Sequence, residues 1–153
     1  LGYNVEPSEI GAAFGLVQLD KLERNIVARE ANFQRQLAFF QDYQDWFVLP
    51  RQLQGARTGW LAFPLTIRAD APFTRREMQI HLEERDIQTR PVFTGNILRQ
   101  PAMADVEART NAAGYRVADD VMRGGILLAC HHGLDNAQIG FMHETFRSFA
   151  ARY

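Results

Sequence analysis

The chain has 153 residues, enough for one domain, because a domain commonly holds ~100–200 residues. With 46% apolar and 23% charged residues, it has the composition of a globular protein and not that of a disordered or fibrous one. The net charge of −1 leaves no cationic excess to neutralise a phosphate backbone, which argues against nucleic-acid binding. A single cysteine, Cys130, excludes an internal disulfide or a cysteine-rich metal site within this chain and favours a reducing compartment such as the cytoplasm.

No segment of the sequence has the length and polarity expected of a membrane span. The longest uncharged stretches are 10–19 and 124–134, well below the ~20 residues that a spanning helix needs. The chain opens with Leu1 and shows no signal peptide. We therefore expect no membrane association, and we expect this chain to begin inside a longer reading frame or to have been processed.

A long helix is predicted over 9–40, with Ser8 as N-cap and Glu9 in the first turn, where the helix dipole favours a carboxylate. In the segment 10–17, apolar residues surround nearly the whole circumference of this helix, which is typical of a buried helix. We expect this end either to dock on a domain or subunit absent from the chain, or to fold into the local core after a break near Gly15. The later part has an apolar stripe at helical spacing, formed by Leu19, Leu22, Ile26, Phe33, Leu37 and Phe40.

The rest of the chain predicts an α+β fold: a small, mostly antiparallel sheet with helices on one face. A capping box begins at Thr74, and Asp135 precedes the last helix with Gln138 three residues on. Pro64 interrupts an otherwise alternating strand and indicates an edge position or a bulge. The predicted elements are strands at 46–50, 60–68, 87–93 and 125–130, helices at 74–85, within 106–122 and after 135, and a loop or short helical turn at 95–103.

Adjacent histidines follow the last predicted strand. If the strand extended to them, His131 and His132 would point to opposite faces and would not chelate one ion easily. We interpret them as loop histidines and expect no metal site. Cys130 ends an apolar strand, and we interpret it as a buried, inert thiol.

Polar and cationic side chains gather at the end of the strand predicted over 87–93 and in the loop after it. Arg90, Asn96 and Arg99 lie within ten residues, where binding groups commonly sit on a rigid support. Arginine presents a planar fork suited to phosphate or carboxylate. The alternative is a surface loop with ordinary charges.

Two sequence blocks resemble a known family. Leu1-Gly2-Tyr3-Asn4 and the stretch SEIGAAFGLVQLDKL at 8–22 resemble the opening of the C-terminal part of the DegT/DnrJ/EryC1/StrS sugar aminotransferases, which are fold-type-I pyridoxal-phosphate enzymes. The block IQTR at 87–90, followed by FTGNILRQP at 93–101, is similar to the branch that holds the CDP-4-keto-6-deoxyglucose 3-dehydrases of lipopolysaccharide biosynthesis. Aminotransferases of this family commonly carry a histidine where this chain has Val92, which favours the dehydrase branch.

The resemblance implies that residues 1–153 are a single C-terminal small domain, with 1–40 forming a loop plus the long connecting helix, and that an N-terminal cofactor domain is missing. It implies a homodimer in which Asn4 reaches the phosphate of pyridoxal or pyridoxamine phosphate in the other subunit. Arg90, Asn96 and Arg99 become candidates for binding the nucleotide sugar. The catalytic base and any 2Fe–2S cysteines would lie upstream, so no catalytic residue and no metal ligand is assigned here.

Three hypotheses follow. The first is the C-terminal domain of a 3-dehydrase that removes the C3 hydroxyl of a CDP-4-keto-6-deoxyhexose in O-antigen biosynthesis. The second is the same domain of a nucleotide-sugar aminotransferase. The third is a stand-alone interaction domain that binds a partner through Ile10–Val17. Under the first two, we expect the isolated chain to hold no cofactor and to be inactive.

Overall fold

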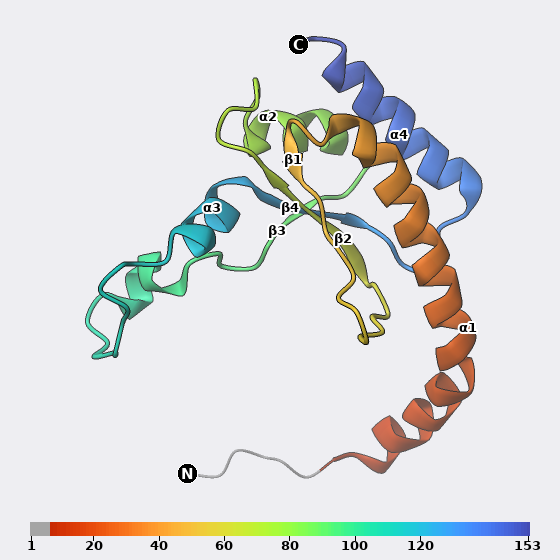
Figure 1. Cartoon of the computed structure of the whole chain (residues 1–153). Helices are drawn as coiled ribbons and strands as arrows, with labels where there is room; N and C mark the ends of the chain where they lie inside the picture. The colour runs from red at the N-terminus through yellow and green to blue at the C-terminus, as the bar shows by residue number, and fades with distance from the viewer. Residues whose placement is uncertain (1–6) are drawn as a thin grey trace.

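The computed structural model describes residues 7–153, and in this range the chain forms an α+β fold (Figure 1). Figure 1 shows α1, α2 and α4 close to the sheet, while the turn-rich segment before α3 projects away from them. In chain order the elements are α1 (Glu9–Phe40), β1 (Phe47–Val48), β2 (Ala62–Ile67), α2 (Arg75–Glu83), β3 (Arg90–Pro91), α3 (Arg116–Gly124), β4 (Gly125–Ala129) and α4 (Asn136–Ala150), with short 3₁₀ helices at Gln41–Tyr43, Ile97–Arg99 and Pro101–Met103.

The sheet has the order β1-β2-β4-β3, and every neighbouring pair is antiparallel. The predicted α+β class is therefore confirmed. Pro64 lies in an inner strand, but β1 pairs only with Thr66 and Ile67, so at Pro64 the strand has a partner on the β4 side alone. The missing N–H is tolerated because this stretch is locally an edge.

The strand predicted over 87–93 is much shorter than expected. Its first residue is bound in a turn, because the Ile87 N–H donates to the Leu82 carbonyl over 3.0 Å. Its end bends away when the Phe93 N–H donates to the Pro91 carbonyl at 2.9 Å. Only Arg90 and Pro91 remain paired with β4. The alternation predicted for 60–68 also fails at its start, where Leu61 is exposed.

One face of the sheet carries the core. Phe63, Leu65 and Ile67 of β2 are buried together with Ile126 and Leu128 of β4. Aromatic rings from α1, β1 and α4 fill the space against this face, including Phe33, Phe40, Phe47, Phe146 and Phe149. The stripe predicted for the last helix, Ile139, Met142, Phe146 and Phe149, is buried as expected. Since side chains alternate between faces, Ala62, Pro64, Leu127 and Ala129 lie half-buried on the opposite, open face of the sheet.

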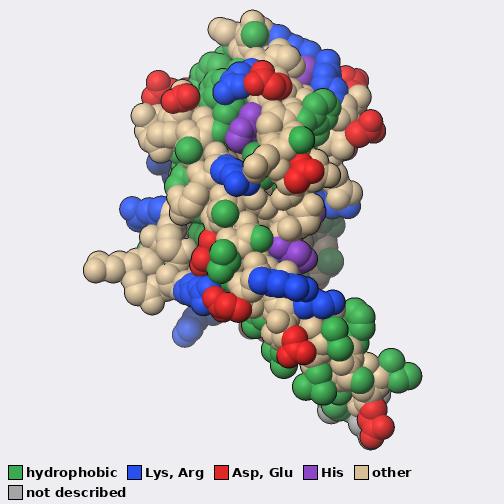
Figure 2. Space-filling model, turned by 90° about the vertical axis from the view of Figure 1, so that its right-hand side faces the viewer, with side chains coloured by type: hydrophobic (Ala, Val, Ile, Leu, Met, Phe, Trp, Pro, Cys, Tyr) green, Lys and Arg blue, Asp and Glu red, His purple; other side chains and the backbone are tan. Residues whose placement is uncertain are grey.

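Helix α1 is continuous, so the expected alternative of a break near Gly15 is wrong. The predicted inner stripe packs into the core only in the second half of the helix, at Phe33 and Phe40, while Leu19 and Leu22 are exposed. The first half projects from the body, and Figure 2 shows hydrophobic side chains over this end. Ile10 is 84% exposed and Phe14 68%, which leaves a large apolar surface in contact with water.

None of the helices within residues 7–153 is both long and apolar enough to cross a lipid bilayer.

Candidate functional site

The candidate binding segment runs from β3 into the 3₁₀ helix Ile97–Arg99, and α3 fixes it in place. Gly95 has φ of +63°, and a Cβ atom there would lie 2.3 Å from the Cβ of Met122. Glycine is thus required both by the backbone conformation and by the close approach to α3. The next residue, Asn96, caps the 3₁₀ helix by accepting a hydrogen bond from the Leu98 N–H at 3.1 Å.

Two of the predicted site residues meet on one carboxylate. Arg99 donates two hydrogen bonds to Asp119 of α3, from Nε at 3.0 Å and from Nη2 at 2.9 Å. Asn96 is buried, and its Nδ2 donates to the same carboxylate at 2.8 Å. The Arg99 guanidinium and the Asn96 amide lower the pKa of Asp119 to about 2. This clamp holds the loop after β3 against α3 and orients both side chains.

Arg90 lies apart from this clamp. It is exposed on β3 opposite Leu127 of β4, and residues directly opposite each other in an antiparallel pair share a face, so Arg90 belongs to the open face. Among residues 7–153, Arg90 has no acidic partner within ion-pair distance. Its charge is available to an anion.

Arg90 also borders a cavity of about 620 Å³, within the range of ~300–1,000 Å³ typical of small-molecule sites. β3 pairs only with Ile126 and Leu127, and the cavity lies along the next part of β4, between the segment 86–90 and the start of α4. Its apolar walls include Leu127, Ala129, Leu134, Ala137 and Phe141, and its polar residues are Asp86, Gln88, Arg90, His131 and Gln138.

Sequence reasoning missed this cavity, because its lining comes from three separate segments. One local signal was present: Phe141 lies outside the buried stripe of α4 and is 55% exposed. A single exposed ring is common on protein surfaces, and Phe141 is relevant here only together with the apolar residues of the cavity that it lines.

Phe93 is a second outlier of the same region. It has φ of +46°, a conformation that costs a bulky side chain energy, and it is 86% exposed. Such strain persists only where the neighbouring structure fixes the backbone, and it is commonly found near functional sites. Here the neighbouring Gly95 and Asn96 are both held against α3.

The other chemically suggestive residues have structural surroundings. His131 and His132 lie in a loop, as expected: the Gly133 N–H donates to Nδ1 of His131 at 3.2 Å, and Arg29 Nη2 approaches Nδ1 of His132 at 3.3 Å. Cys130 is buried, as predicted, and burial raises the pKa of its thiol to about 11. Among the described residues no three His, Cys, Asp or Glu side chains gather closely enough to hold a metal ion.

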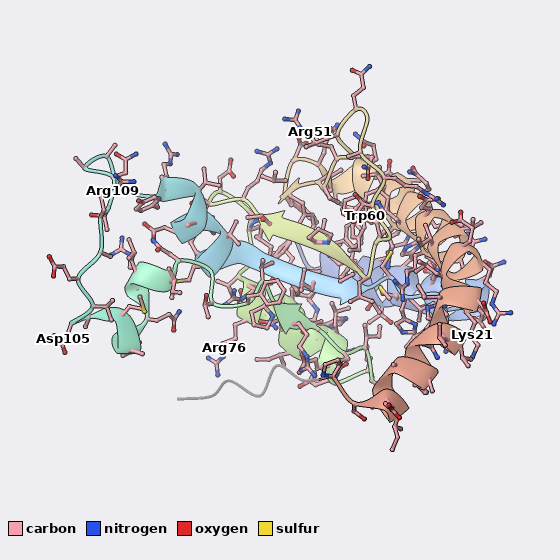
Figure 3. All side chains as sticks on the ribbon, turned by 90° about the horizontal axis from the view of Figure 1, so that it is seen from below. Lys21, Arg51, Trp60, Arg76, Asp105 and Arg109 are labelled. Atoms are coloured by element: carbon pink, nitrogen blue, oxygen red, sulfur yellow. The ribbon has the colours of Figure 1, made fainter. Side chains whose placement is uncertain are left out.

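Two residues bear on a cofactor. Asn4, the predicted phosphate contact, lies outside the described residues. Lys21, the single lysine of the sequence, lies on α1 (Figure 3), on the opposite side of the molecule from the segment that carries Asp105 and Arg109.

Comparison with known proteins gives consistent matches. Residues 1–147 match the model of the DegT/DnrJ/EryC1/StrS aminotransferase family. The chain is 30% identical over 149 residues to the lipopolysaccharide biosynthesis protein RfbH of Salmonella typhimurium, covering 97% of this chain and 34% of that protein. It is 35% identical over 146 residues to a GDP-4-keto-6-deoxy-D-mannose 3-dehydratase of Escherichia coli O55:H7, covering 95% of this chain and 37% of that protein.

The fold agrees with a solved structure as well. The E. coli GDP-4-keto-6-deoxy-D-mannose-3-dehydratase with bound hydrated PLP superposes with a TM-score of 0.84 at 26% identity, over 94% of this chain and 36% of that one. The chain thus spans about a third of the length of the curated relatives it matches.

Proposed function

The chain belongs to the DegT/DnrJ/EryC1/StrS aminotransferase family, and from this membership we propose that it is the C-terminal domain of a sugar-nucleotide 3-dehydratase. The whole protein would remove the C3 hydroxyl of a CDP-4-keto-6-deoxyhexose, with pyridoxamine phosphate as cofactor, in the cytoplasmic part of O-antigen biosynthesis. The observation that carries this proposal is the similarity, over nearly the whole chain, to proteins named as 3-dehydratases and as a lipopolysaccharide biosynthesis protein.

The proposed domain organisation assigns 1–153 to one C-terminal domain, with 1–40 as loop plus connecting helix, and places a cofactor domain before it. The length of the relatives supports this division. The exposed apolar end of α1 supports it too, because Ile10, Phe14 and Leu16 leave an apolar surface that the preceding domain or a second subunit of a homodimer would bury.

The proposed substrate contacts are Arg90, Asn96 and Arg99. Arg90 offers the guanidinium without an acidic partner among the described residues, and it is the strongest candidate for the diphosphate of the nucleotide sugar. Arg99 and Asn96 are held by Asp119, so they would meet the substrate through their remaining N–H groups.

The residues described here do not fit a complete cofactor site. Lys21 is the only side chain of the sequence that could form an imine, and it lies on α1, on the opposite side of the molecule from the segment that carries Asp105 and Arg109. We propose that the cofactor and any 2Fe–2S cluster are held by the preceding domain, and that Asn4 adds a phosphate contact across the dimer. The isolated chain is then expected to bind no cofactor and to be inactive.

A nucleotide-sugar aminotransferase is the second candidate, favoured by the description of the family itself. Val92 in place of the aminotransferase histidine favours the dehydratase. A stand-alone interaction domain that binds through Ile10–Val17 is a third reading, and it requires that no cofactor domain precede this chain in the gene.

The test is to purify the complete parent protein with pyridoxamine phosphate and to incubate it with CDP- and GDP-4-keto-6-deoxyhexoses. Mass spectrometry should detect a 3-deoxy product that is lighter than the substrate by one oxygen atom, because a hydrogen replaces the C3 hydroxyl; pyridoxamine phosphate would supply the two electrons for this replacement. Formation of an amino sugar with glutamate as donor would instead establish the aminotransferase. The residue at the upstream Schiff-base position gives an independent check, since histidine is expected for the dehydratase and lysine for the aminotransferase.

A further inference from the structure

We infer that His81 and Arg152 form a proton-sensitive latch. A neutral His81 imidazole holds the turn at 151–153 against α2, and a protonated one releases it. The two residues are 71 positions apart in the sequence and come together only in the fold. Neither lines the cavity beside β4 or belongs to the candidate binding segment, so the latch goes beyond the proposed function.

His81 is a buried imidazole with polar neighbours at both ring nitrogens. It lies on α2 and faces α4. Its Nε2 is 3.2 Å from the Thr145 carbonyl oxygen and 3.0 Å from Ser148 Oγ, both on α4. Its Nδ1 is 2.6 Å from Nη2 of Arg152, in the turn after α4. The ring therefore connects α2 both to α4 and to the turn that follows it.

The neighbours of Nε2 determine where the single N–H hydrogen of the neutral ring lies. The Thr145 carbonyl can only accept a hydrogen bond. The Ser148 hydroxyl donates its own hydrogen to that carbonyl at 2.7 Å, so toward His81 it also accepts. Nε2 must then carry the hydrogen, and the free lone pair of Nδ1 accepts from Arg152, whose guanidinium has donors only.

Protonation of His81 makes the contact with Arg152 repulsive. A charged imidazole carries a hydrogen on both nitrogens, so Nδ1 would point a donor at a donor. Two positive charges would also lie within hydrogen-bond distance of each other. Since Arg152 cannot act as an acceptor, it has to leave Nδ1 when the ring is charged.

The surroundings of His81 favour its neutral form. Burial lowers the pKa of His81, and the positive charges of Arg85 on α2 and of Arg152 lower it further. The backbone contact of Nε2 and the charge of Glu84 act in the opposite direction. Glu77 borders the same cavity, but its carboxylate accepts the hydrogen bonds of the α2 capping box. The latch is therefore closed at neutral pH and opens in acid.

The latched turn covers aromatic rings at one end of the core. The guanidinium carbon of Arg152 lies 5.7 Å from the centre of the Phe149 ring. The Tyr153 ring packs on Phe73 and Phe149, with centroids 5.4 and 5.5 Å apart. Phe73 and Phe149 are both buried, so release of the turn would expose apolar surface there without unfolding the sheet.

The experiment is an NMR titration of the ¹³C,¹⁵N-labelled 153-residue chain from neutral to acidic pH. At neutral pH the ¹⁵N shifts of His81 should show the Nε2–H tautomer, and NOEs should connect the rings of Tyr153 and Phe73. Below the ordinary histidine pKa of about 6.5, the ratio of open to closed latch should rise by up to about tenfold per pH unit. The Tyr153–Phe73 NOEs should then weaken, while those between Phe40 and Phe146 persist.

A histidine variant separates the latch from other titrating groups. His81→Gln cannot gain a proton in this range, so its Tyr153–Phe73 NOEs should no longer depend on pH. His143→Gln is the control, because His143 stacks on Phe39 of α1 and has no contact with Arg152. It should leave the titration of these NOEs as in the wild type.

An arginine variant tests the facing charge. Arg152 is exposed apart from this contact, so Arg152→Gln should fold normally, and it should raise the pKa of His81. Arg76→Gln, at an exposed position of the same helix as His81, should leave that pKa unchanged.

Four outcomes would overturn the inference: an Nδ1–H tautomer at neutral pH, protonation of His81 with the Tyr153–Phe73 NOEs intact, the same pH dependence in His81→Gln, or an unchanged pKa of His81 in Arg152→Gln. If His81→Gln does not fold, the tautomer and the Arg152→Gln titration still decide.

Discussion

Replacing Gly95 by alanine measures how firmly the candidate binding loop is held against α3. The new methyl group would lie 2.3 Å from the Cβ of Met122 and 2.5 Å from its Cα, and the Cα cannot move aside by a change of rotamer. Overpacking of this kind costs about 1–3 kcal/mol. The φ of +63° adds about 1–2 kcal/mol for an L-residue in the left-handed region. Gly95→Ala should therefore lower the free energy of unfolding by about 2–5 kcal/mol.

Gly114→Ala is the matched control. Gly114 has φ of +73°, but a Cβ there would meet no atom within 4 Å, so only the conformational cost of about 1–2 kcal/mol applies. Urea unfolding of both variants, followed by circular dichroism, gives the two values directly. Equal losses of stability in Gly95→Ala and Gly114→Ala would refute the reasoning, because the contact with Met122 would then contribute nothing.

Three further predictions concern single residues. The carboxyl of Asp119 should titrate with a pKa of about 2 in carbon-detected NMR, and this pKa should move back toward 3.8 in Arg99→Gln. The stability that this group contributes should be lost as pH falls from 3.8 to about 2, and an unchanged pKa in Arg99→Gln would contradict the clamp. Burial lowers the pKa of His143 from 6.5 to about 4, so between these values the unfolded chain binds more protons and the free energy of unfolding should decrease as pH falls. In acid-unfolding curves His143→Gln should flatten this pH dependence, and an unchanged slope of stability against pH would exclude His143 as its source. Phe14 is 68% exposed, so Phe14→Ser should change the free energy of unfolding of this chain by less than about 0.5 kcal/mol. In the parent protein the same substitution should lower solubility or assembly, as measured by light scattering.

The features that sequence predicted well are those determined by neighbouring residues. The capping box at Thr74 forms as expected, since the Glu77 N–H donates to Thr74 Oγ1 and the Thr74 N–H donates back to the Glu77 carboxylate. Asp135 and Gln138 form the same reciprocal pair before α4. Both motifs depend on residues three apart, so the sequence contains the whole interaction.

The features that sequence missed depend on contacts between distant segments. The strand predicted over 87–93 has a suitable composition, but only Arg90 and Pro91 find a partner on β4. The clamp joins Arg99 to Asp119, and nothing in the local pattern of α3 distinguishes Asp119 from its neighbour Asp120, which is also half-buried, as the residue that faces the loop. Tertiary packing decides both outcomes, as it commonly does for strands.

The two faces of the sheet have separate roles, which explains why a chain of this length folds while its site stays open. The helices and aromatic rings cover one face completely, and Phe63 and Leu128, a directly paired couple, are almost fully buried there. On the other face the next pair, Pro64 and Leu127, is only half-buried, and Arg90 continues that row. Stability therefore comes mainly from the covered face, whereas the open face can change its side chains at little cost to the core. Substitution of Leu128 by alanine should cost about 2–5 kcal/mol, while Leu127→Ala, at a half-buried position, should cost clearly less. Equal destabilisation by the two variants would show that the open face is part of the core after all.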